Sequence, residues 1–264
     1  MRRAFVAELL KLRRRSVFVA AAAVAVVYSI ITTLAVFLPA ESAAANPVRA
    51  LVAESLESLA LPQGATAAFG IGVGFLGIIL LAVFISNIGS EYTRGTFASA
   101  LMKQPRRLRL LAGKMAALLL FLAGTLLVAE VIGVIVGWAI APARGISTSA
   151  WFSIDGLGDG LSAYGRALFV AFSWASFGTA VAIFTRSVPV ALGIGIGWAG
   201  PAEHIIEQAW SGAPGWFPGL SLETFAVGGT ATFSSTRALT MVLMYATVIV
   251  AAALFSFSRR DVTT

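Results

Sequence analysis

The sequence predicts an all-α, polytopic membrane protein, with residues 1–264 forming a single transmembrane domain of six transmembrane helices. Hydrophobic residues make up 58% of the chain and charged residues only 12%, whereas a soluble domain carries about 25% charged residues. Too few polar side chains remain to cover a water-facing surface. The chain also has one histidine and no cysteine, so we expect no metal site, since such sites need clusters of these ligands.

Apolar runs of about 20 residues, the length that crosses a bilayer core of ~30 Å, predict the spans. Their predicted ranges are about 17–38, 65–88, 115–140, 166–185, 188–206 and 238–257. The fifth is the weakest, because its uncharged part is short, rich in glycine and stopped by Pro201. It reaches spanning length only if the helix continues towards Ile206.

The distribution of charge supports six spans rather than five. With six spans both termini lie on one side, which then holds 15 of the 19 Lys and Arg residues, while eight of the twelve acids lie on the other. This is the positive-inside pattern and predicts cytoplasmic termini in a multi-pass protein of the plasma (inner) membrane. Five spans would place Arg259 and Arg260 outside. The net charge of +7 therefore indicates contact with anionic membrane lipid, and no nucleic-acid partner is expected.

The first apolar run is interpreted as a retained span. Ala43, Ala44 and Ala45 resemble a signal-peptidase site, but the run over 17–38 is longer than the 7–15 residues of a signal-peptide core. Residues 1–15 predict an amphipathic interfacial helix, with Phe5 and Leu9 on its apolar stripe. A basic cluster without fixed structure is the alternative.

Residues 201–236 are too polar to span and too aromatic for an ordinary loop. Trp210 and Trp216 suit a membrane interface, while Pro214 and Pro218 break helices. We expect short re-entrant helices between spans five and six. Irregular backbone at membrane depth must be enclosed by protein or line a cavity, so this segment is expected to cap a pathway.

Glu130 is the one ionisable residue well inside a predicted span. A carboxylate there costs on the order of 3 kcal/mol, so it should face the bundle interior or water. It is either a substrate-pathway or proton-handling group, or a structural acid hydrogen-bonded to a neighbouring helix. His204 beside Glu203 is interpreted as a polar pair at a helix start rather than a ligand site.

The chain carries no motif for chemistry of its own. The G-x-G-x-x-G pattern of residues 72–77 lies inside a predicted membrane helix with no preceding strand, so close helix packing explains it better than nucleotide binding. There is no P-loop and no nucleophile–base–acid set. We therefore expect no catalytic residues and no cofactor in this chain, and an energy source elsewhere.

The basic loop over 89–114 predicts a short helix at about 91–103 along the cytoplasmic surface. Ser90 is placed to cap this helix, with Glu91 in its first turn. Phe97 and Leu101 share an apolar face, and Pro105 ends the element. A loop that only sets topology needs neither helix nor stop, so we interpret it as a docking surface for a partner's groove.

These residues resemble a known family. Glu91-Tyr92-x-Arg94-Gly95-Thr96, followed by an apolar stretch and a proline, is similar to the first cytoplasmic loop of type-2 ABC exporter permeases. The resemblance implies that this loop is the coupling helix, docked on a separate ATPase subunit. The expected coupling residues are Glu91, Tyr92, Arg94, Gly95, Thr96, Phe97, Leu101 and Pro105.

The resemblance also implies the partners and the activity. ATP and Mg²⁺ would bind the partner ATPase, present as two copies or a heterodimer, and a second permease subunit, the same or a different chain, would complete the path. The chain would be a non-enzymatic permease that exports an amphipathic drug, lipid or peptide. Two alternatives stay open: a proton-coupled secondary transporter using Glu130, and a non-transporting membrane anchor or sensor.

Overall fold

The computed structural model describes residues 2–38, 56–103 and 106–259, and every regular element among them is helical. Five of these helices are long and apolar enough to cross a membrane. They are α2 (Arg15–Phe37), α5 (Ala67–Thr93), α7 (Arg107–Ile140), α8 (Ile154–Thr185) and α12 (Ser235–Arg259). They match five of the six predicted spans, so the multi-pass helical architecture is confirmed.

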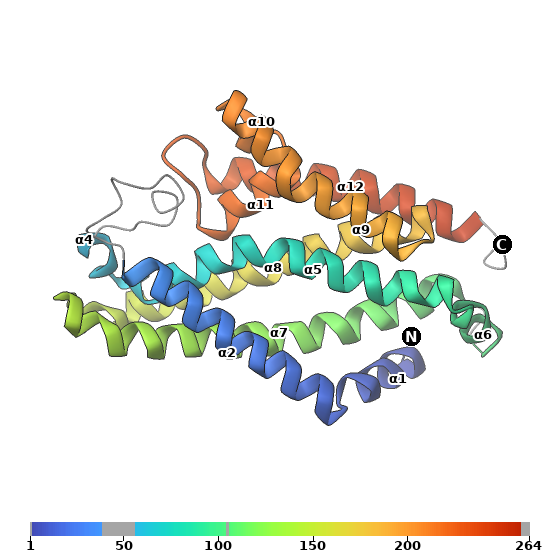
Figure 1. Cartoon of the computed structure of the whole chain (residues 1–264), viewed down its shortest axis with the longest axis horizontal. Coiled ribbons are helices and arrows are strands. Elements are labelled where there is room, and N and C mark those ends of the chain that lie inside the picture. The colour runs from blue at the N-terminus through green and yellow to red at the C-terminus, as the bar shows by residue number, and fades with distance from the viewer. Residues whose placement is uncertain (1, 39–55, 104–105, 260–264) are drawn as a thin grey trace.

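Short elements connect the long helices. On the chain they are α1 (Arg2–Leu12), α4 (Leu56–Leu59), η2 (Pro62–Thr66), α6 (Thr96–Lys103), η3 (Ala141–Arg144), η4 (Ser149–Phe152), α9 (Val188–Gly197), η5 (Trp198–Ala202), α10 (Glu203–Ala209), η6 (Ala213–Gly215) and α11 (Pro218–Ala226). The first residue of α1, the end of α12, α6 and the α8–α9 turn lie at one end of the bundle, as Figure 1 shows. We call this the α6 end, and it gathers the basic segments identified from the sequence.

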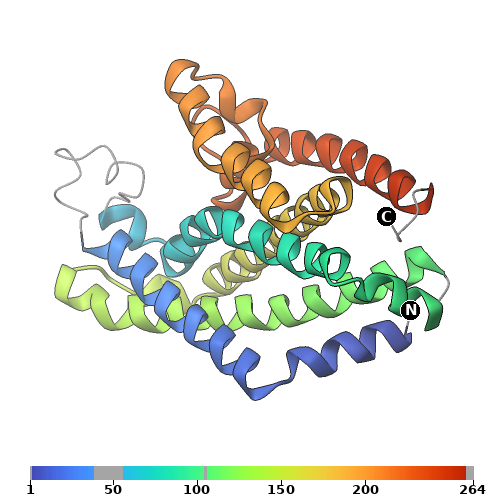
Figure 2. The same ribbon diagram turned by 45° about the vertical axis from the view of Figure 1, so that its right-hand side comes forward.

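The core lies between α5 and α8, which run side by side through the centre of the molecule (Figures 1 and 2). Trp174 of α8 is buried and packs directly against Gly77 of α5, where no side chain separates the two helices. Close helix packing therefore explains Gly77, the last glycine of the G-x-G-x-x-G pattern. Helices α2 and α7 flank this pair on one side, and α9 and α12 on the other.

The predicted fifth span is interrupted. Helix α9 alone has ten residues, or about 15 Å at 1.5 Å per residue, too short to cross a bilayer. It continues through the π-helical turn η5, which contains Pro201, into α10. Proline lacks an N–H and widens the helix here. The helical run over 188–209 has the length of a span, and the six-span topology stays a prediction.

Helix α1 lies against α7. Its most buried residues are Ala4 and Glu8, whereas Val6 and Leu10 remain 44% and 60% exposed. The predicted apolar stripe through Phe5 is only half-buried in this contact. Helix α1 therefore has two sides: one packs on the bundle, and the other presents apolar groups outwards.

Candidate functional site: the α6 junction

The candidate site is the packing of α6 on the ends of the long helices, which we call the α6 junction. Helix α5 continues through Ser90, whose hydroxyl donates to the carbonyl of Asn87 (3.1 Å). The helix ends at Thr93, and Gly95, two residues later, has φ +65° and donates its N–H to the carbonyl of Tyr92 (3.1 Å). Glycine occupies this left-handed position without steric cost.

Helix α6 therefore begins at Thr96, later than the start near Ser90 expected from the sequence. The two candidate capping residues, Ser90 and Glu91, belong to the last turns of α5 instead. Pro105 lies outside the described residues, so the predicted stop at that position cannot be compared with the structure.

An aromatic cluster fixes α6 to its own chain. The ring of Phe97 is buried, 1% exposed, and stacks on Tyr92 of α5 with 5.0 Å between centroids. On its other side it meets Phe257 of α12 edge-on at 5.4 Å. The guanidinium of Arg186, in the α8–α9 turn, lies 5.8 Å from the centre of the Tyr92 ring. Two segments distant in the sequence, at Phe257 and Arg186, thus contact the predicted coupling residues Phe97 and Tyr92 respectively.

A buried ionic network adds two more helices to the junction. The ammonium of Lys114, in α7, lies 3.1 Å from Oε2 of Glu8, in α1, and forms a short ion pair with Glu91 of α5. Lys11 reaches the same carboxylate of Glu8 at 2.9 Å and Glu91 at 4.0 Å. The side chains of Lys114 and Glu8 are only 5% and 4% exposed.

The charges offset the cost of burying these groups. Burial raises the pKa of Glu8, but the hydrogen bonds and positive charges of Lys11 and Lys114 outweigh it, so the pKa lies below its ordinary value of 4.5. A buried charge is tolerated when it is paired and hydrogen-bonded. Glu8 was not among the residues predicted from the sequence, although it is an acid among the basic residues of a predicted helix.

The remaining predicted coupling residues form the outer side of the junction. Arg94, Gly95 and Thr96 are exposed, and Leu101 is half-buried against the aromatic cluster. Met102 is 82% exposed and is the largest apolar group that α6 presents outwards. The side of α6 that carries Phe97 is therefore occupied by its own chain, and only the Met102 side is open.

Glu130 is separate from this junction. It is 7% exposed in α7, and its Oε1 lies 3.8 Å from where a side chain on Gly160 of α8 would begin. No ion pair with Glu130 occurs within the described ranges. The carboxylate faces the bundle interior, as expected, which is compatible with either of its two interpretations.

Charged groups also hold α11 at both ends. Glu203 of α10 is fully buried, and its Oε2 accepts the backbone N–H of Leu220 in the first turn of α11 (2.9 Å). Arg166 of α8 donates from Nε to the carbonyl of Ala226 at the other end (3.2 Å). An anion at the amino end and a cation at the carboxyl end both complement the helix dipole.

Taken together, these features define an all-helical, multi-pass membrane protein whose α6 end joins several long helices. A family described as ABC-2 family transporter protein matches residues 4–196, which include α6 and the α6 junction apart from Phe257 of α12, and end within α9. The chain therefore belongs to the ABC-2 family and is a type-2 ABC transporter permease, a non-enzymatic transport subunit of a family that works with an ABC ATPase. No curated protein and no solved structure matches the chain.

Proposed function

We propose that this chain is the membrane subunit of an ATP-driven exporter and that α6 is the element through which a separate ATPase moves it. The observation that carries the proposal is the convergence at the α6 junction. Phe97 links α6 to α12, while Glu91 and Lys114 link the end of α5 to α7 and α1. A displacement of α6 would therefore act on several helices at once.

The docking surface in this proposal differs from the one the sequence suggests. Phe97 is buried inside the chain, so it would hold α6 in place, and Met102 with Arg94 would contact the partner. An exposed apolar group on a short helix, with an exposed basic residue just before that helix, suits a groove with an apolar floor and an acidic rim. The partner would bind ATP and Mg²⁺, and this chain would bind neither.

In the same proposal, a second permease subunit completes the transport path. Helices α2 and α7 expose apolar side chains over much of their length, among them Ile31 (58%) and Ile135 (57%). Lipid and a second subunit would share these faces. Elements η6 and α11, which lie between α10 and α12 in the chain, would form the re-entrant cap on the outer side. The exported compound would be amphipathic.

The test uses a single exposed side chain on α6. Met102→Glu places a charge on the proposed contact without disturbing the buried aromatic cluster. Ile154→Glu is the matched control, because Ile154 is 89% exposed and begins α8 far from α6. The tagged chain is purified from native membranes, and ABC ATPase in the eluate is measured by mass spectrometry together with ATP hydrolysis.

We expect an ATPase to accompany the parent chain and the Ile154 variant, and to be lost from the Met102 variant. Recovery of the parent chain without any ABC ATPase would contradict the proposed function. Retention of both the ATPase and its stimulated hydrolysis in the Met102 variant would contradict the docking surface alone.

A further inference from the structure

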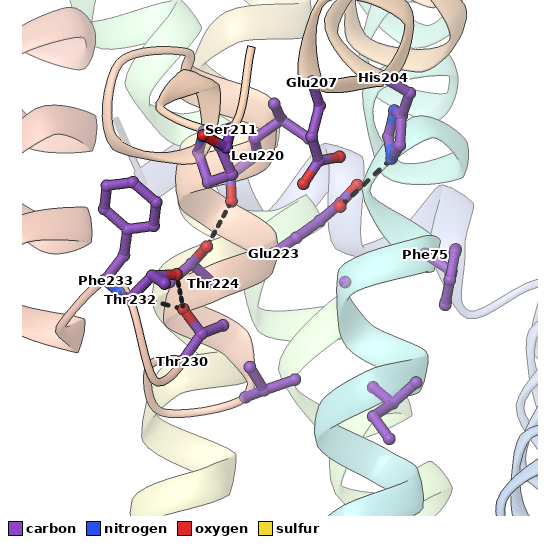
Figure 3. Close-up of a pocket in the computed structure, with 14 residues that line it drawn as sticks. Phe75, His204, Glu207, Ser211, Leu220, Glu223, Thr224, Thr230, Thr232 and Phe233 are labelled. Atoms are coloured by element: carbon purple, nitrogen blue, oxygen red, sulfur yellow. Dashed lines mark hydrogen bonds and ion pairs between the residues drawn. The ribbon is translucent and has the colours of Figure 1, made fainter. Parts of the chain in front are cut away.

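A cavity of about 480 Å³ lies between α5, α10, α11 and the segment leading into α12 (Figure 3). Its volume is within the range of about 300–1,000 Å³ that small-molecule sites occupy. Phe75 of α5 forms one wall, Glu223 of α11 lies inside, and Phe233 closes the far side. Most of the lining follows residue 196 and so lies beyond the part that matches the family.

The polar groups of this cavity carry an excess of negative charge. Glu207 and Glu223 direct their carboxylates into the same space beneath α10, as Figure 3 shows. Nε2 of His204 lies 3.4 Å from Oε2 of Glu223, and its Nδ1 lies 2.7 Å from the carbonyl of Gly200. Both ring nitrogens face oxygen acceptors, which favours the cationic imidazolium.

His204 pairs directly with Glu223 and its charge also acts on Glu207, so one imidazolium faces two carboxylates. Glu207 forms no ion pair with a lysine or arginine in the described parts of the chain. Arg237 of α12 lies over the ring of Phe233, with its guanidinium carbon 5.1 Å from the ring centre. Glu207 is therefore a half-buried carboxylate that pairs with no lysine or arginine among the described residues. Such a carboxylate, in a cavity with largely apolar walls, attracts the positive group of a ligand.

Most of the remaining lining is apolar or aromatic, and the hydroxyl groups of Ser211, Thr224, Thr230 and Thr232 complete it. Ile71 and Phe75 come from α5, Val227 follows α11, and Phe233 precedes α12. Phe75 is 54% exposed, which leaves its ring accessible from the cavity. Aromatic faces attract cations as well as apolar groups. The cavity therefore combines largely apolar walls with a net negative charge.

We propose that this cavity binds an organic cation with an apolar body, its positive group beside Glu207 and its body against Phe75 and Phe233. The identification of this ligand as the exported substrate rests on the proposed function. Binding itself does not, because the cavity is built entirely from this chain. Lipid or peptide substrates without a positive charge would not use this site.

The experiment measures binding of ethidium, a fluorescent aromatic cation, to the full chain in nanodiscs without any ATPase. Glu207→Gln removes the charge and keeps the shape, and Glu207→Lys reverses the charge. Asp155→Asn is the matched control, because Asp155 is an exposed acid in the first turn of α8, outside the cavity. Fluorescein serves as the anionic probe in every variant.

We expect Glu207→Gln to weaken ethidium binding about tenfold, the loss of roughly one charge-assisted contact. Glu207→Lys should abolish ethidium binding and increase binding of fluorescein, while Asp155→Asn should match the parent chain. Equal ethidium affinity in the parent and Glu207→Lys would overturn the proposal. So would an equal loss in Asp155→Asn, which would indicate a general effect of surface charge.

The outcome is independent of the ATPase assignment. If ethidium fails to bind while an ABC ATPase still accompanies the chain, only the ligand class is wrong. If ethidium binds and no ATPase accompanies the chain, the cavity is a cation site in a protein with another energy source. Pro214→Ala and Phe75→Ala, which change the shape of the cavity without changing its charge, should also weaken ethidium binding.

Discussion

Nζ of Lys114 lies 3.1 Å from Oε2 of Glu8, although 106 residues separate them in the sequence. The contact joins the helix that precedes the first span to the start of α7. Because Lys114 also pairs with Glu91 at the end of α5, one ammonium group connects three helices at the α6 end. The first two predictions concern this network.

Replacement of Lys114 by methionine should destabilise the fold by about 3–5 kcal/mol, since it removes the buried cation shared by Glu8 and Glu91 and leaves them only the exposed Lys11. Thermal unfolding of the purified chain measures the change. Lys11→Met is the matched control, because Lys11 is 54% exposed and its ion pair with Glu8 should contribute less than about 1 kcal/mol. Equal shifts in the two variants would contradict a special role for Lys114.

The network should also make stability depend on acid pH. The pKa of Glu8 is below 4.5 in the folded chain, so its ionised form is favoured by folding. This contribution is fully present above the unfolded pKa of 4.5 and is lost as the pH falls through the lower folded value. We expect the melting temperature to fall less steeply below pH 4.5 in Glu8→Gln than in the parent chain. Parallel profiles would argue against this pairing.

Replacement of Gly95 by alanine should weaken the α5–α6 junction. Gly95 has φ +65° and open space around its Cα, so the effect is conformational and costs about 1–2 kcal/mol. Gly124→Ala is the matched control, because Gly124 also has open space around it but lies within the regular helix α7. There alanine should be neutral or stabilising by about 0.5–1 kcal/mol. Thermal unfolding distinguishes the two, and Asn at position 95 should be tolerated better than Ala.

Replacement of Glu203 by alanine should loosen α11. The carboxylate of Glu203 accepts the N–H of Leu220, and its loss should cost about 1–2 kcal/mol. Hydrogen exchange followed by mass spectrometry should show faster exchange in 218–226 and little change in the centre of α5. Glu207→Ala, on the same helix, should leave this exchange as it is. Slow exchange of 218–226 in Glu203→Ala would show that the cap is dispensable.

The sequence predicted the features that follow from composition and local pattern. Long apolar runs must form helices in lipid, because no other partner exists for their backbone groups. Five predicted spans therefore correspond to long helices. The predicted fifth span was the hardest to predict because it runs up to and past Pro201, and the structure places a π-helical turn at that proline.

The sequence was less informative about the α6 junction. Gly95 was predicted to be a coupling residue, and its left-handed conformation moves the helix start from near Ser90 to Thr96. The apolar face of Phe97 was interpreted as a surface for a partner, whereas it packs inside the chain. Helical periodicity shows which residues share a face and contains no information about what covers that face.

Tertiary relationships between distant segments were not predictable. Lys114 was grouped with the basic residues that set topology, and its pairing with Glu8 depends on how α1 folds back onto α7. The cavity beside Glu207 likewise requires α5, α11 and Phe233 to meet. Single-sequence patterns describe neighbours along a helix, and these contacts join elements that are far apart in the chain.

The contact between Glu8 and Lys114 also has a temporal consequence during synthesis of the chain. Ribosomes add about 5–20 residues per second, so Lys114 emerges roughly 5–20 s after its partner. During this interval α1 has no tertiary anchor at Lys114, and its outward apolar side chains, Val6 and Leu10, can hold it on the lipid surface. We therefore expect α1 to adsorb to the membrane first and to dock onto α7 second, with one side of the helix used in each step.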